Sequence, residues 1–170
     1  MRLTAFSDYS LRALMYLGIH GDRLATIGEL ADAYGISENH LVKVVHHLAQ
    51  HGYIETIRGR GGGMRLARPP GDINVGEVVR ATEDSLALVE CFDGSTSQCR
   101  IEPACRLKGM LGRALDAFFA TLDGYTLADL LVPGPRLAAL LVNPRHGGAP
   151  RRAPGRPATG ARARGLSRTG

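Results

Sequence analysis

No stretch of this 170-residue sequence stays apolar for the roughly twenty residues that a membrane-spanning helix needs. Charged residues such as Asp116, Asp129 and Arg136 interrupt the later apolar stretches. The amino-terminal stretch contains Asp8 and Arg12 and has no small-residue cleavage site, so it does not resemble a signal peptide. We therefore expect a cytoplasmic protein that does not bind membranes.

Signatures of common enzymes are also missing. The sequence has no Walker phosphate-binding loop, no nucleophile elbow and no pair of carboxylates arranged for acid–base catalysis. Residues 58–63 are rich in glycine, but their spacing is not that of a dinucleotide-binding loop, and an alternating strand pattern follows them instead of a helix. We expect a protein that is not an enzyme.

Acidic residues are absent from the carboxy-terminal tail, residues 144–170, which holds seven arginines. The formal net charge is +5, yet the chain without this tail has 14 basic and 16 acidic side chains. Within that part, basic residues outnumber acidic ones in residues 1–70. A folded nucleic-acid-binding surface is therefore expected there. The tail has almost no large apolar side chain, and we expect it to be disordered.

The order of the predicted elements is typical of a winged helix-turn-helix. Apolar spacing predicts a first helix that ends at Gly21, a second over residues 26–34 and a third over residues 37–51. Alternating, β-branched patterns then predict strands at residues 53–57 and 64–67, joined by the glycine-rich loop. We expect a mostly helical α+β fold.

The third predicted helix is the one that would enter the DNA major groove. Its exposed candidates for DNA contact are Ser37, Glu38, Asn39, His40 and Lys43. Asn39 and His40 can hydrogen-bond to base edges, and Lys43 can bind phosphate or guanine. Ser37 can bind a phosphate near the start of the helix. The alternative is a helix face that contacts water alone.

The glycine-rich loop carries Arg58 and Arg60 at the tip of the predicted hairpin. Its glycines would let the backbone approach a DNA duplex closely. The two guanidinium groups therefore predict contact with the minor groove or with phosphates. An ordinary hairpin tip without a role in binding is the alternative.

Residues 71–143 are expected to form a second part of the protein, distinct from a DNA-binding domain at residues 1–70. A short helix is predicted from about Val75 to Thr82. After Pro103, apolar residues mark one face of a helix of about five turns. They are Leu107, Leu111, Ala114, Phe118 and Leu122. So strong an apolar face favours a homodimer, in addition to any packing against the same chain.

The three cysteines, Cys91, Cys99 and Cys105, all lie within fifteen residues. Their surroundings are rich in glycine and serine and offer little apolar core in which free thiols could be buried. Thiolates select zinc, copper(I) or iron-sulfur clusters, and the wide spacing suits a multi-iron cluster better than structural zinc. A thiol switch without iron and an electron-transfer module are the alternatives.

These features together resemble the Rrf2 family of iron-sulfur winged-helix repressors. The resemblance covers residues 1 to about 135 and rests on the cysteine spacing and three stretches: MRLTAFSDYSLRALMYL, ISENHLVKVVHHLAQHGYI and RGRGGGMRLA. It implies a homodimer crossed by long helices, with a cluster held by Cys91, Cys99 and Cys105. It also implies binding to double-stranded promoter DNA while the cluster is intact.

Within the family, the sequence is more similar to the nitric-oxide-sensing branch. The branch that regulates iron-sulfur biogenesis has a histidine shortly after the third cysteine, whereas Arg-Leu-Lys follows Cys105 here. The nitric-oxide-sensing branch implies that nitric oxide attacks the iron and releases DNA. It favours a [4Fe-4S] over a [2Fe-2S] cluster.

Three cysteines leave one iron short of a protein ligand. The resemblance implies that a carboxylate from the first helix of the other subunit fills this place, and Asp8 stands at the matching position. Glu90, Asp93 and Glu102 are local alternatives, and Asp8 would also suit the start of its own helix.

Overall fold

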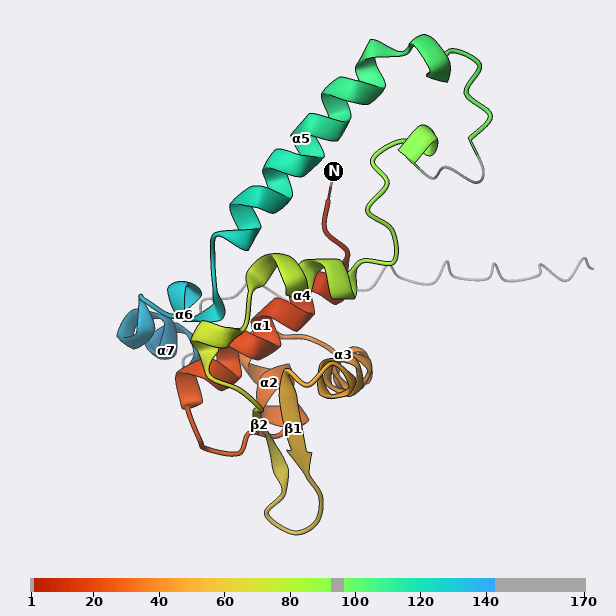
Figure 1. Ribbon diagram of the computed structural model, residues 1–170. Helices are drawn as coiled ribbons and strands as arrows, with labels where there is room; N and C mark the ends of the chain where they lie inside the picture. The colour runs from red at the N-terminus through yellow and green to blue at the C-terminus, as the bar shows by residue number, and fades with distance from the viewer. Residues whose placement is uncertain (1, 93–96, 143–170) are drawn as a thin grey trace, which may run out of the picture.

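Three helices and a hairpin make up the amino-terminal part of the computed structural model, which describes residues 2–92 and 97–142 (Figure 1). The helices are α1 (Ala5–His20), α2 (Ile27–Tyr34) and α3 (Glu38–Gln50). The hairpin consists of β1 (Ile54–Ile57) and β2 (Gly63–Leu66). The expected disordered tail at residues 144–170 lies outside the described residues.

Local side-chain bonds set where the first two helices begin. The Thr4 hydroxyl accepts a hydrogen bond from the Ser7 backbone N–H, and Thr26 forms a reciprocal capping box with Glu29. Such caps satisfy backbone donors that have no partner inside the helix. Ser37 occupies the capping position of α3, as expected, but its side chain makes no capping bond.

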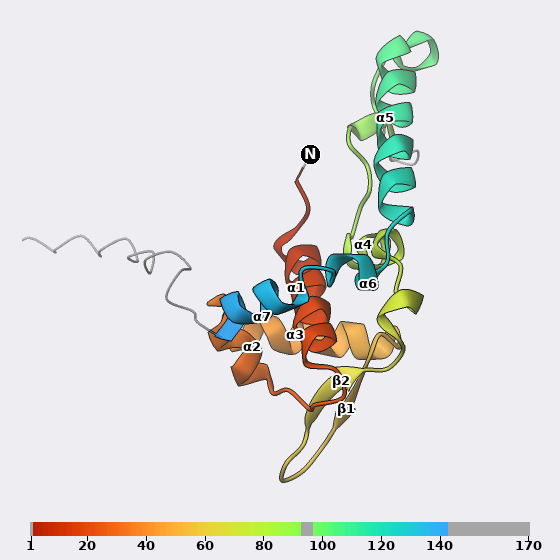
Figure 2. The ribbon, with the colours of Figure 1, turned by 90° about the vertical axis from the view of Figure 1, so that its left-hand side faces the viewer.

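The hairpin is antiparallel, with Ile54 opposite Leu66 and Ile57 opposite Gly63. It projects away from the three helices (Figures 1 and 2). Met64 pairs with Ala25 by two backbone hydrogen bonds, of 2.8 and 2.9 Å, which join the hairpin to the segment before α2. The predicted winged helix-turn-helix order is therefore confirmed.

The core of this part lies where α1, α2 and α3 meet. Its members recur at helical spacing on the inward faces, which is the pattern from which the helices were predicted. The largest fully buried side chains of the three helices are Leu14, Leu17, Leu30, Leu41 and Leu48. Burial of these leucines fixes which face of α3 is left for solvent.

Two further helices follow the hairpin, α4 (Val75–Thr82) and the long α5 (Arg106–Asp123). Figures 1 and 2 show α5 projecting from the body of the molecule, with its carboxy-terminal end next to α4. Leu107 and Met110, near its free end, are 57% and 58% exposed. The predicted five-turn helix is confirmed, and much of its apolar face is uncovered in the single chain.

Sequence reasoning did not anticipate the helices after α5. The short α6 (Leu127–Leu130) and α7 (Gly134–Val142) return to the winged helix, where α7 lies near α2 (Figure 2). Leu127 is 1% exposed, and its backbone N–H donates to Ile73 O at 2.8 Å. Residues after α5 therefore pack in the same core as residues 1–70. The expected division at residue 70 stays a prediction.

None of the helices in residues 2–92 and 97–142 combines the length and the apolarity needed to cross a membrane.

Leu127→Ala is expected to lower the free energy of unfolding by about 2–5 kcal/mol, because truncating a buried leucine leaves a cavity. Chemical denaturation at fixed protein concentration measures the change. Val132→Ala is the control, because Val132 is 79% exposed. It is expected to change stability by less than about 0.5 kcal/mol. Equal losses in the two variants would contradict this role of Leu127.

Candidate functional site

The amino-terminal half of α3 presents all five predicted DNA-contacting side chains to solvent. Ser37, Glu38, Asn39, His40 and Lys43 are each exposed. The buried residues of the same helix begin at Leu41 and lie on its other face, so packing against α1 orients the exposed ones outward. A helix of this kind can enter a major groove with its early residues against the base edges. Which bases or phosphates they contact stays a prediction.

The tip of the hairpin places Arg58 and Arg60 in solvent. Gly59 and Gly61 have φ values of 104° and 79°, which residues with a side chain adopt rarely. A Cβ at Gly62 would lie 2.2 Å from Ile57 O, so the turn leaves no room for a side chain there. The glycines thus make the tight tip that carries the two arginines. Their contact with DNA stays a prediction.

The three cysteines lie in the segment between α4 and α5, which we call the cysteine segment (residues 91–105). Cys91 is buried within the short turn Glu90–Phe92. Cys105 follows the turn Glu102–Ala104 and caps α5, and Cys99 lies between the two turns. All three are free thiols, and Cys99 and Cys105 are partly exposed.

Positive charge surrounds the carboxy-terminal end of this segment. The Cys105 sulfur accepts a hydrogen bond from the Lys108 backbone N–H at 3.4 Å. The Lys108 ammonium donates to Glu102 at 2.6 Å, and this contact is the main cause of its raised pKa. Lys108 also lines the same hollow as Cys91. Together with the start of α5, it would balance negative charge on a group bound there.

The three thiols suit a thiolate-ligated metal group, but the single chain does not gather them into a finished site. Within residues 2–92 and 97–142, no three histidine, cysteine, aspartate or glutamate side chains are grouped closely enough to hold a metal ion. Metal binding can itself complete such a site, because it is coupled to the folding of the segment that carries the ligands. A hollow of about 810 Å³ lies beside Cys91, with Phe92, Lys108 and Leu115 in its wall. The assignment of Cys91, Cys99 and Cys105 as ligands stays a prediction.

The candidate carboxylate ligands have other partners in the structure. Asp8 is half-exposed on α1 and forms an ion pair with Arg12, with an Oδ2–Nη2 distance of 2.9 Å. Glu90 accepts a hydrogen bond from the Gln98 backbone N–H, and Glu102 accepts one from Ser97 as well as from Lys108. Asp93 lies outside the described residues. The fourth ligand stays a prediction.

A polar cluster ties the chain just before the cysteine segment to the start of α1. Glu83 Oε1 accepts hydrogen bonds from Thr4 N at 2.8 Å and from the Ser7 hydroxyl at 2.5 Å. The Ser7 hydroxyl, fully buried, also accepts one from Thr82 at 2.9 Å. Because buried hydroxyls without partners are costly, this cluster fixes the start of α1 against the end of α4.

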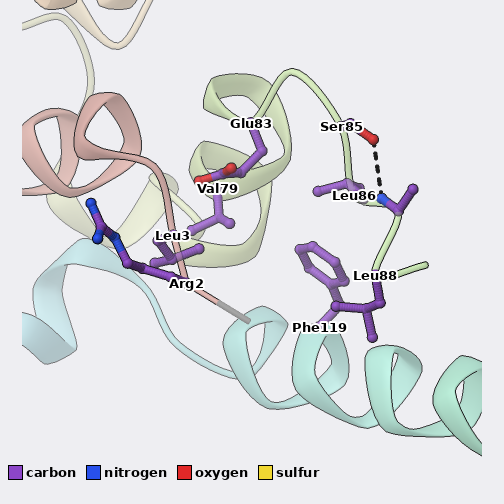
Figure 3. A pocket seen from close by; sticks show the side chains of 9 residues that line it. Arg2, Leu3, Val79, Glu83, Ser85, Leu86, Leu88 and Phe119 are labelled. Atoms are coloured by element: carbon purple, nitrogen blue, oxygen red, sulfur yellow. Dashed lines mark hydrogen bonds between the residues drawn. The ribbon is translucent and has the colours of Figure 1, made fainter. Parts of the chain in front are cut away.

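A hollow of about 220 Å³ borders this cluster (Figure 3). Leu3 and Val79 line one side, and Leu88 and Phe119 lie across from them. The wall therefore combines Arg2 and Leu3, which precede α1, with residues of α4, of the irregular chain after α4 and of α5. The residues before α1, the chain between α4 and the cysteine segment, and the long helix meet at this point.

Comparison with known proteins agrees with this architecture. The family model described as "Rrf2: Iron-dependent Transcriptional regulator" matches residues 3–133. The chain is 52% identical to the HTH-type transcriptional regulator NsrR of Shouchella clausii, over 83% of this chain and 95% of that protein. It is 54% identical to NsrR of Bacillus subtilis, over 77% and 90%. The solved structure of T. potens IscR superimposes with a TM-score of 0.62 at 27% identity, over 77% of this chain and 86% of the other.

Arg60→Ala is expected to weaken DNA binding for every duplex sequence by a similar factor, because a backbone-contacting arginine carries no base information. The slope of log Kd against log salt should fall by about one unit. Fluorescence anisotropy over a salt series measures both. Arg65→Ala is the matched control, since Arg65 lies in β2 and pairs with Glu55 instead of standing at the tip. An unchanged salt slope for Arg60→Ala would remove Arg60 from the interface.

Proposed function

This chain belongs to the Rrf2 family of iron-dependent transcriptional regulators, and we propose that it is a nitric-oxide-sensing repressor within that family. It acts as a cytoplasmic homodimer and a regulator, not as an enzyme. The observation that carries the proposal is the 52% and 54% identity to two regulators named NsrR, across most of both chains. Identity to the solved IscR is 27%, so a role in cluster biogenesis is not favoured.

The cofactor is an iron-sulfur cluster, with [4Fe-4S] favoured over [2Fe-2S]. Cys91, Cys99 and Cys105 hold it, and Asp8 of the second subunit supplies the remaining ligand. A bound cluster supplies iron that reacts with nitric oxide. Lys108 and the start of α5 place positive charge near the sulfurs, which offsets the charge of several thiolates in one small site.

The uncovered face of α5 supports a homodimer. Leu107 and Met110 are more than half exposed, and Phe119 is the one α5 residue that is buried within the described chain. An apolar helix face of this length is stabilised by burial against a second copy. Since Cys105 caps the same helix, the dimer interface and the cysteines lie next to each other.

The proposed partner is double-stranded promoter DNA, read by two copies of α3 and of the hairpin tip. A dimer presents two recognition helices, and their separation must match two half-sites on the duplex. A change in the angle between the two halves of the dimer therefore alters affinity without altering any contacting side chain. This geometry lets a remote cofactor control DNA binding.

Titration of the anaerobically purified dimer with nitric oxide tests the proposal. We expect visible absorbance from stoichiometric iron and sulfide, and we expect the absorbance change and the loss of promoter binding to follow the same titration curve. Absorbance and anisotropy recorded on one sample measure both. Colourless protein that binds at full strength and ignores nitric oxide would contradict the proposal and favour a thiol switch.

Cys99→Ala is expected to abolish the visible absorbance and to weaken specific promoter binding, because two thiolates would then remain to hold the cluster. Iron and sulfide analysis together with anisotropy measures the result. Gln98→Ala is the control, since Gln98 is exposed and its backbone N–H, which bonds to Glu90, is retained. Cluster-dependent binding at wild-type strength in Cys99→Ala would exclude Cys99 as a ligand.

A further inference from the structure

The recognition helix α3 is hydrogen-bonded directly to α4 through His47. His47 Nε2 donates to Ala81 O at 2.9 Å. Ala81 lies in the last turn of α4, where backbone carbonyls have no partner inside the helix. The imidazole therefore donates to a backbone carbonyl at the end of α4 and links α4 to the recognition helix α3.

Arg80, the residue before Ala81, binds the end of the long helix α5. The Arg80 guanidinium donates to both carboxylate oxygens of Asp123, at 2.6 and 2.7 Å, and lies 4.4 Å from the centre of the Phe119 ring. Asp123 ends α5. A Cβ at Gly76 would lie 1.9 Å from Asp123 Oδ1, so the glycine allows this close approach. Consecutive residues of α4 thus contact α5 and α3.

The surroundings of His47 point to an internal contact and not to DNA reading. Its ring packs edge-on against Phe6 at 5.2 Å and stacks on His51 at 4.1 Å. Burial is the largest cause of its lowered pKa, followed by the nearby His51, while the Ala81 carbonyl and Asp84 oppose the shift. A neutral imidazole turned toward α4 is poorly suited to bind phosphate, but it retains the N–H that Ala81 needs.

We propose that His47 is a positioning residue. Its hydrogen bond transmits movement of the α4–α5 joint, which Arg80 and Asp123 form, to the recognition helix. When α5 changes its angle, the Arg80–Asp123 pair moves α4, and the hydrogen bond from His47 to Ala81 moves α3 with it. His47 touches neither DNA nor the cluster. This inference rests on the proposed function, because the cluster's state supplies the movement.

The test compares operator affinity in two states for three variants of the full-length dimer. The probe is a duplex selected from a random pool by the wild-type protein. Kd is measured for the cluster-loaded protein and for the same sample after nitric oxide, and their ratio is the readout. In His47→Phe, which keeps a ring but has no donor, this ratio should fall by about fivefold. In His47→Gln, whose amide restores a donor, it should stay within about twofold of the wild-type value.

His51→Phe is the matched control. His51 is exposed one turn later on the same face, and its ring nitrogen bonds within its own helix, to His47 O at 2.9 Å. Its ratio should equal that of the wild type. Visible absorbance and thermal midpoint, recorded for every variant, separate a change in coupling from loss of the cluster or of the fold.

An unchanged ratio in His47→Phe would overturn the inference, and this includes the case in which affinity falls equally in both states. If His47→Phe does not fold, the same ratio is measured for Arg80→Met. This variant keeps the contact with Phe119 and removes the ion pair with Asp123. Its ratio should fall by about threefold, and an unchanged ratio would again overturn the inference. A wild-type ratio of one would instead refute the proposed function itself, together with this inference.

Discussion

The structure depends on the last turn of α4, because residues 80–83 contact every element that has to move together. Arg80 holds the end of α5, the Ala81 carbonyl accepts from α3, and Thr82 and Glu83 bond to the start of α1. The start of α4 adds further contacts, because Asn74 Nδ2 donates to Asp123 O at 2.7 Å and Val75 N donates to Tyr125 O at 3.0 Å, while the rest of α5 projects away from the winged helix (Figure 1). The position of the end of the long helix is therefore set by both ends of α4.

The contact between Arg80 and Asp123 is specific in direction but weak. The Arg80 and Asp123 side chains are 39% and 43% exposed, and a pair this open to water contributes no more than about 1 kcal/mol. The leucine core of α1–α3, in contrast, is stabilised by burial of whole side chains. The winged helix is thus the rigid body, and the joint can change its geometry without unfolding it. Such a difference in stability is what a switch between two arrangements requires.

The winged helix could be predicted because each of its elements has a local signal. Thr26 with Glu29 caps α2, and the spacing of leucines marks the inward faces of α1 and α3. The return of the chain through α6 and α7 had no comparable signal. Leu127 is held in the core by distant residues such as Ile73, and Pro133 and Gly134 break the apolar pattern into pieces too short to interpret.

The residues of the candidate site also fall into those with a local sequence signal and those without one. Exposure of the α3 and hairpin-tip side chains follows from the amphipathic pattern of their own elements, so sequence alone located them. The cysteines lie within fifteen residues of one another, but under the proposed function their final arrangement depends on bonds to iron and on a second chain, and neither is encoded in local spacing. The role of His47 had no signal in the sequence, since its spacing to His51 resembles a metal-binding pair but no third ligand is nearby. Its actual partner, Ala81, is a backbone carbonyl 34 residues away, which no motif records.

A second copy would complete two unfinished features at one end of the molecule. Leu107 and Met110 are exposed in the first turns of α5, immediately after Cys105, so a chain that covers them also borders the cysteine segment. If Asp8 of that chain then binds the cluster, at least one of its two carboxylate oxygens has to leave Arg12 on α1. Assembly of the cofactor and orientation of the partner's α1 would then be one event. Loss of the cluster would free α1, and with it the core that α1 shares with the recognition helix.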